Sequence, residues 1–101
     1  MLDELFHVLS HGTRRVILAE LLERGENEAI RALPIVSSGE VSDDEVRLDL
    51  HHTHLPMLAQ SGYVEWNGTD DRVSRGPAFD DFEPLLVLLD ESAESLPGDW
   101  P

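Results

Sequence analysis

The apolar residues in the first third of the chain recur with helical spacing. Residues 2–9 carry them at positions i, i+3, i+4 and i+7, which predicts a helix whose buried face is Leu2, Leu5, Phe6 and Leu9. A second helix is expected from Thr13, as its N-cap, to about Arg24, with Gly25 as the C-terminal cap. A short third helix is expected over residues 28–33, ending before a proline.

The clearest helix start lies in the middle of the chain. Ser42-Asp43-Asp44-Glu45 has the S-x-x-E form of a capping box, with further acids at the positive end of the helix dipole. We expect this helix to run over residues 43–60, with a buried face formed by Leu48, His51, Leu55 and Leu58. Pro56 lies inside it and predicts a kink, since proline removes one backbone hydrogen bond. The connection before the helix, residues 34–41, is long for a helix-turn-helix.

A hairpin and a last helix complete the pattern. Residues 63–66 alternate like a strand, Asn67-Gly68 predicts a turn, and residues 72–74 form the return strand. A closing helix is expected over about residues 80–94. The pattern therefore predicts a mainly α-helical chain with a small β-hairpin, of the α+β class.

Length and composition limit the chain to one domain. It has 101 residues and is 41% hydrophobic, enough for a single modest core. We divide it into a main domain at residues 1–78, a closing helix at 79–95 and an irregular tail at 96–101. No apolar run approaches the roughly 18 residues of a membrane span. The absence of cysteine excludes disulfides and thiolate zinc sites. The acidic start, without a basic signal-type region, leads us to expect a cytoplasmic protein.

The charge balance suggests the environment of the protein. Twenty-one acids face seven bases, giving a formal charge of −14, and every base is an arginine because lysine is absent. Such a surface repels itself at ordinary ionic strength but much less in molar salt, where the Debye length falls to about 3 Å. Acids spread along the whole chain without lysine are typical of salt-in halophiles, so we interpret the sequence as haloarchaeal.

Two motifs carry a family resemblance. Residues 54–65, H-L-P-M-L-A-Q-S-G-Y-V-E, resemble the H-L-x-x-L-x-x-x-G-hydrophobic-V signature of ArsR-like regulators. Residues 8–22 are similar to the opening L-S-x-x-x-R-x-x-I-L-x-x-L of that family, and His52-Thr53-His54-Leu55-Pro56 resembles the H-T-H-L-P-x-L motif of small haloarchaeal winged-helix domains. The resemblance covers about residues 2–75. It implies a winged helix-turn-helix with an added C-terminal helix, acting as a DNA-binding transcription regulator and usually as a dimer.

In that fold residues 43–60 are the recognition helix and residues 63–74 the wing. The outward helix face contains side chains able to contact base edges in a major groove, namely His52, Thr53, Met57 and Gln60, although Asp49 lies among them. Arg72 and Arg75 flank the wing and are our candidates for the DNA backbone or minor groove. Arg14 and Arg15 are expected to be largely structural.

The histidines raise a metal hypothesis. His51 and His54 are spaced i, i+3, which suits chelation of one zinc or nickel ion, but no cysteine and no fixed third ligand accompany them. We favour a structural role at the edge of the core and predict neither metal nor other cofactor. No nucleophile elbow, ordered triad or phosphate-binding glycine loop is present, so we predict no enzymatic activity and no small-molecule substrate.

The closing helix is apolar around most of its circumference. One stripe at i, i+3, i+4 and i+7 suffices to pack on the domain, namely Phe82, Leu85, Leu86 and Leu89. Val87 and Leu88 extend the apolar surface around the helix, which favours a two-fold interface with a second copy of the chain. The candidate dimer residues are Phe82, Leu85, Val87 and Leu88. The alternative is that the first helix covers this surface within one subunit.

The sequence therefore predicts a homodimeric regulator that binds double-stranded DNA and no membrane. A rival from another class is a winged-helix protein-interaction module that no longer binds DNA. The acidic recognition face and the long connection favour this rival.

Overall fold

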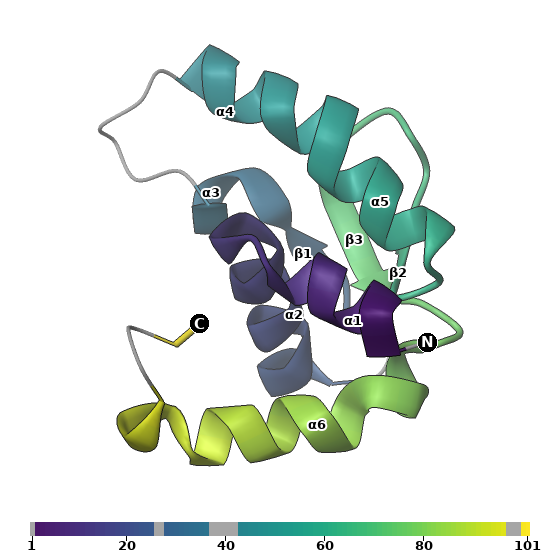
Figure 1. The fold of residues 1–101 in the computed structure, drawn as a ribbon. Coiled ribbons are helices and arrows are strands. Elements are labelled where there is room, and N and C mark those ends of the chain that lie inside the picture. The colour runs from purple at the N-terminus through teal and green to yellow at the C-terminus, as the bar shows by residue number, and fades with distance from the viewer. Residues whose placement is uncertain (1, 26–27, 37–42, 97–99) are drawn as a thin grey trace.

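The computed structural model describes residues 2–25, 28–36, 43–96 and 100–101. Within these residues the chain is mainly helical and carries one small antiparallel sheet of strand order β1-β3-β2 (Figure 1). The helical elements are α1 Leu2–Leu9, α2 Gly12–Arg24, α3 Ala32–Val36, α4 Asp43–Asp49, η1 Leu50–His54, α5 Leu55–Gln60, α6 Phe79–Glu91 and η2 Ala93–Ser95. The strands are β1 Ile30–Arg31, β2 Val64–Trp66 and β3 Arg72–Arg75. The predicted α+β class is confirmed.

One apolar core joins these elements. Figure 1 places α6 along one side of α2, with α4 to α5 on the opposite side of the molecule. The largest fully buried side chains come from both ends of the sequence and meet around α2: Val8, Ile17, Leu18, Leu21, Leu50, Leu55, Leu58, Val73, Phe79 and Leu86. No helix in the described part of the chain is long and apolar enough to cross a bilayer.

Helix α1 has its predicted bounds but a different buried face. Leu5 and Val8 are buried, whereas Phe6, predicted to be buried, is 58% exposed. Leu5 and Val8 are spaced i, i+3, so the helix is rotated from the orientation that the apolar pattern predicted. That rotation is fixed by α2, whose first turn binds the last carbonyl groups of α1, as described below.

Two local predictions in this region are wrong. Helix α2 begins at Gly12, and its N-cap is His11, whose Nδ1 accepts the Thr13 N–H at 3.2 Å. The short helix expected at residues 28–33 is instead strand β1 followed by α3, because Ile30 pairs with Val73 and Arg31 with Arg72 across the sheet. Pro34 falls in the first turn of α3, where the missing N–H costs no helical hydrogen bond. The C-cap at Gly25, with φ 117°, is confirmed.

The predicted helix of residues 43–60 is present but interrupted. Residues 50–54 form a π-helical turn in which the Leu55 N–H donates to the Leu50 carbonyl, five residues back. Such a turn inserts one extra residue, which shifts the side chains on either side relative to each other. As a result Leu50 is buried at 1% exposure, whereas Leu48, predicted to be buried, is 58% exposed. The predicted cap at Ser42 and the connection beyond residue 36 lie outside the described residues.

Close backbone contacts hold the hairpin against α6. Gly62 has φ 80°, and its carbonyl accepts the Ala78 N–H at 2.8 Å. Gly76 lies so close to this turn that a Cβ there would be 2.3 Å from the Gly62 oxygen. Only glycine fits this position, so the end of α5, the base of the hairpin and the start of α6 form one tightly packed joint.

Candidate nucleic-acid interface

The helix formed by α4, η1 and α5 presents one side to the core and the other to solvent. Leu50, His54, Leu55 and Leu58 are buried, while His52, Thr53 and Gln60 are exposed and Met57 is half-buried. The side chains predicted for base contact therefore lie on the outer side and are accessible to a large partner.

These four residues share one surface hollow. His52, Thr53, Met57 and Gln60 line a depression of about 570 Å³ together with Pro56, Ser61 and Glu4. Glu4 comes from α1 and was not anticipated, because nothing in the local sequence predicts that the first helix reaches the end of α5. Its carboxylate places a negative charge beside the helix face.

The hairpin carries one of the two predicted arginines outward. The side chain of Arg72 is exposed, and its backbone N–H donates to Asp70 Oδ1 at 2.9 Å. Asn67 Oδ1 accepts the N–H groups of Thr69 and Asp70, which fixes the turn that leads to this position. The side chain of Arg72 therefore lies on the solvent side of the hairpin.

Arg75 does not have the predicted role. Its guanidinium forms an ion pair with Glu83 at 2.6 Å and donates to the carbonyl oxygens of Leu21 and Leu22 at 3.2 and 3.1 Å. It also lies 4.5 Å over the ring of Phe79. With only 10% of its side chain exposed, Arg75 joins β3 to α2 and α6 and is not available to DNA.

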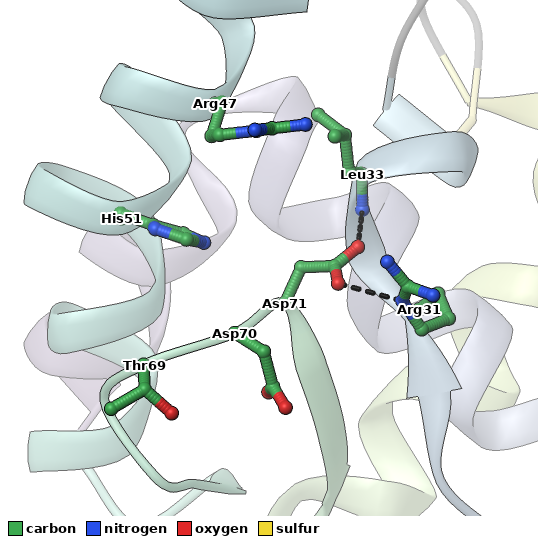
Figure 2. A pocket seen from close by; sticks show the side chains of 7 residues that line it. All are labelled: Arg31, Leu33, Arg47, His51, Thr69, Asp70 and Asp71. Atoms are coloured by element: carbon green, nitrogen blue, oxygen red, sulfur yellow. Dashed lines mark hydrogen bonds and ion pairs between the residues drawn. The ribbon is translucent and has the colours of Figure 1, made fainter.

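A polar pocket of about 330 Å³ separates the helix from the wing (Figure 2). Arg47 and His51 project into it from the helix, and Arg31 faces them from β1. Arg31 and Arg72 are direct partners in the sheet, so both side chains are on the solvent side, opposite the buried pair Ile30 and Val73. Neither Arg31, which lies in the segment expected to form the short third helix, nor Arg47 was predicted as an interface residue.

Asp71 connects the wing to the rest of the domain. Its carboxylate accepts the Leu33 N–H at 2.9 Å and the Arg31 Nε–H at 2.7 Å, so the residue directly before β3 caps the first turn of α3. Burial raises the pKa of Asp71, but these hydrogen bonds and the Arg31 charge outweigh burial and lower its pKa below 3.8. The wing thus has a defined position relative to the helix.

A second buried charge, Arg14, binds the C-terminal end of α1. Arg14 donates from Nε to the Val8 carbonyl at 2.8 Å and from a terminal nitrogen to the His7 carbonyl at 3.0 Å. Arg15 binds the Leu9 carbonyl at 2.7 Å. Both arginines therefore close the C-terminal end of α1, which confirms the structural role predicted for them.

His54 is the side chain that Arg14 contacts in η1. An Arg14 terminal nitrogen lies 3.2 Å from His54 Nδ1, and the His11 ring centroid lies 4.3 Å from that of His54. Burial, and then the neighbouring His11 and Arg14, lower the pKa of His54 to about 4. His54 is thus a neutral hydrogen-bond acceptor at neutral pH.

His51 and His54 have different surroundings despite their i, i+3 spacing. The ring centroid of His51 lies 5.8 Å from that of Trp66, on the wing side of the helix. The part of the chain that the structure describes contains no group of three histidine, aspartate or glutamate side chains placed to hold a metal ion.

The predicted dimer residues divide between the core and the surface. Phe82 is 4% exposed, and its ring centroid lies 4.1 Å from that of Tyr63 and 5.0 Å from that of Phe79. Phe82 therefore belongs to the core and not to an interface. Leu85 is half-buried. Val87 and Leu88 are exposed, at 36% and 58%.

Comparison with known proteins assigns no family to this arrangement of helices and sheet. No family model matches the sequence, and no curated protein or solved structure matches the chain.

Proposed function

We propose that this chain is a DNA-binding transcription regulator of the ArsR-like winged helix-turn-helix type from a halophilic archaeon. The observation that carries the proposal is the exposed helix face containing His52, Thr53 and Gln60, next to a hairpin with an outward Arg72. The order of elements also supports the proposal: helices α1 and α2, strand β1, the short helix α3, the long helix of α4, η1 and α5, the hairpin of β2 and β3, and the closing helix α6.

In this proposal each part of the surface has its own role. The polar side chains on the outer face of the helix contact base edges in the major groove. Arg72 and Arg47 contact phosphates on either side of the polar pocket, positioning the helix without determining sequence preference. Arg31, which pairs with Asp71, supports the wing. The protein is cytoplasmic and has no enzymatic activity.

Salt determines which contacts matter most. The affinity from phosphate neutralisation falls by about 0.9 log unit per contact for each tenfold rise in salt. A regulator working in molar potassium chloride gains little from such contacts and depends on base contacts and shape. A formal charge of −14 is therefore compatible with DNA binding under those conditions.

We further propose that the regulator is a homodimer formed through α6. Val87 and Leu88 supply exposed apolar surface on a helix whose other side is already packed on the core. A two-fold arrangement presents two recognition helices about 34 Å apart, suited to a palindromic site.

The test is a mobility-shift assay in molar KCl with genomic fragments from a halophilic archaeon. Wild type should select a subset of fragments. Arg72→Ala and Arg47→Ala should each weaken binding to all of them and lower the slope of log affinity against log salt concentration by about one phosphate contact. Thr53→Ala and Gln60→Ala should change fragment preference. The matched control is Arg24→Ala, which removes an exposed arginine that pairs with Glu20 on α2 and should have no effect.

If neither wild type nor any variant selects DNA, the proposal is wrong. The protein-interaction module then becomes the better hypothesis. The carboxylate of Glu4 beside the helix face is the observation that favours it.

A further inference from the structure

A second pocket lies away from the polar pocket, where α1, the segment after α5 and α6 meet. It has a volume of about 420 Å³, within the range typical of small-molecule sites. Its walls are mainly apolar and include Leu5, Tyr63, Phe82 and Leu85. The Tyr63 and Phe82 rings are 4.1 Å apart and tilted, so the wall includes aromatic surface.

The charged residues of this pocket are all acidic. Glu4 from α1 and Asp81 from α6 line it, and no described arginine or histidine does. Burial raises the pKa of the Tyr63 hydroxyl, and the charges of Glu4 and Asp81 raise it further, as expected if both carboxylates lie near the phenol. An apolar cavity with two carboxylates and aromatic rings attracts positive charge.

We propose that this pocket binds a lipophilic organic cation, an amine carried on an aryl-alkyl body. The apolar part fills the space between Leu5, Phe82 and Leu85, while the ammonium group lies between Glu4 and Asp81 next to the Tyr63 ring. Glu4 and Asp81 are exposed to solvent, so a neutral ligand of the same shape gains no interaction with their charges, and an anion is repelled by them.

Glu4 connects this pocket to the surface assigned to DNA. Glu4 and Ser61 line both the apolar pocket and the hollow that contains Thr53 and Gln60. A cation bound at Glu4 neutralises the negative charge beside the helix face. Resting on the proposed function, this coupling makes the cation a ligand that strengthens DNA binding.

The binding test is calorimetry on the full chain in molar KCl with three probes of one shape: phenylbutylammonium, phenylbutanol and phenylbutyrate. We expect one site per chain for the ammonium compound, at least about tenfold weaker binding of the alcohol and none of the butyrate. Equal binding of ammonium and alcohol, or no saturable binding, would overturn the proposal.

Variants locate the site. Glu4→Gln/Asp81→Asn should abolish the preference for the ammonium compound over the alcohol. The control Glu65→Gln/Asp90→Asn removes the same charge from exposed positions outside the pocket and should retain the preference. Leu85→Trp, checked for folding by thermal unfolding, should reduce binding of both probes by narrowing the cavity.

Two further outcomes are decisive. If Leu88→Glu binds phenylbutylammonium and wild type does not, a second copy of the chain covers the pocket, and the proposal is wrong. In the mobility-shift assay the ammonium compound should raise the DNA affinity of wild type but not of Glu4→Gln. Calorimetric binding of the ammonium compound without any DNA binding would support the proposed cation site and overturn only the proposed DNA-binding function.

Discussion

Arg14 joins three parts of the molecule through one buried side chain. Arg14, which is 4% exposed, donates hydrogen bonds to two carbonyl groups at the end of α1. It also lies within hydrogen-bond distance of His54 in η1. Buried carbonyl groups without a donor are destabilising. The orientation of α1 and the position of η1 against α2 therefore both depend on this guanidinium.

Replacing Arg14 should therefore destabilise the fold. Arg14→Leu removes all of these hydrogen bonds and leaves their acceptors buried, for an expected loss of about 2–4 kcal/mol in the free energy of unfolding. Urea denaturation followed by circular dichroism measures the change. The control Arg24→Leu, on the exposed side of α2, should leave the free energy of unfolding nearly unchanged; equal losses for the two variants would contradict the assignment.

His54 should make stability depend on pH. Its pKa is about 4 in the folded protein and 6.5 when unfolded, so between these values the unfolded chain binds more protons. The contribution of His54 to the free energy of unfolding is fully present above pH 6.5 and falls by up to about 3 kcal/mol as the pH is lowered toward 4.

Urea unfolding across this pH range measures the effect, and His54→Gln should flatten the dependence. Asp71 acts in a separate window: its pKa lies below 3.8 in the folded state, so its contribution is lost only at lower pH. A His54 ring that titrates near 6.5 by NMR would show that the histidine is not buried beside Arg14.

At the scale of elements, the π turn determines which side chains of the helix formed by α4, η1 and α5 lie in the core. Regular helical spacing placed Leu48 inside, whereas the inserted residue brings Leu50 into the core and leaves Leu48 exposed. Pro56 lies two residues after this turn and lacks the N–H that a regular helix would use. The sequence predicted a kink at Pro56, whereas the structure has a π turn at residues 50–54, before the proline.

The two leucines provide a matched test of this register. Leu50→Ala should lower the free energy of unfolding by about 2–5 kcal/mol, because it empties a fully packed site. Leu48→Ala removes the same atoms from an exposed site and should cost less than about 0.5 kcal/mol. Thermal or urea unfolding distinguishes them, and a larger effect at Leu48 would mean that the helix is regular.

At the scale of the whole molecule, exposed apolar residues on α6 predict association. Leu88→Glu should convert the dimer to monomers, since it places a charge in the apolar interface. Leu48→Glu introduces the same charge at a residue of equal exposure, 58%, outside α6 and should leave the dimer intact. Sedimentation velocity in molar KCl measures both, and a monomeric wild type would contradict the prediction.

The sequence by itself determined the helices α1, α2 and α6, the hairpin turn and the α+β class, because spacing, caps and turn residues act locally. It also placed His52, Thr53, Met57 and Gln60 on one surface and gave Arg14 and Arg15 a structural role. Strand β1, the engagement of Arg75 with Glu83 and the approach of Glu4 to α5 were decided only by the tertiary structure. Each depends on a partner distant in sequence, and no local pattern encodes which carbonyl, carboxylate or strand that partner supplies.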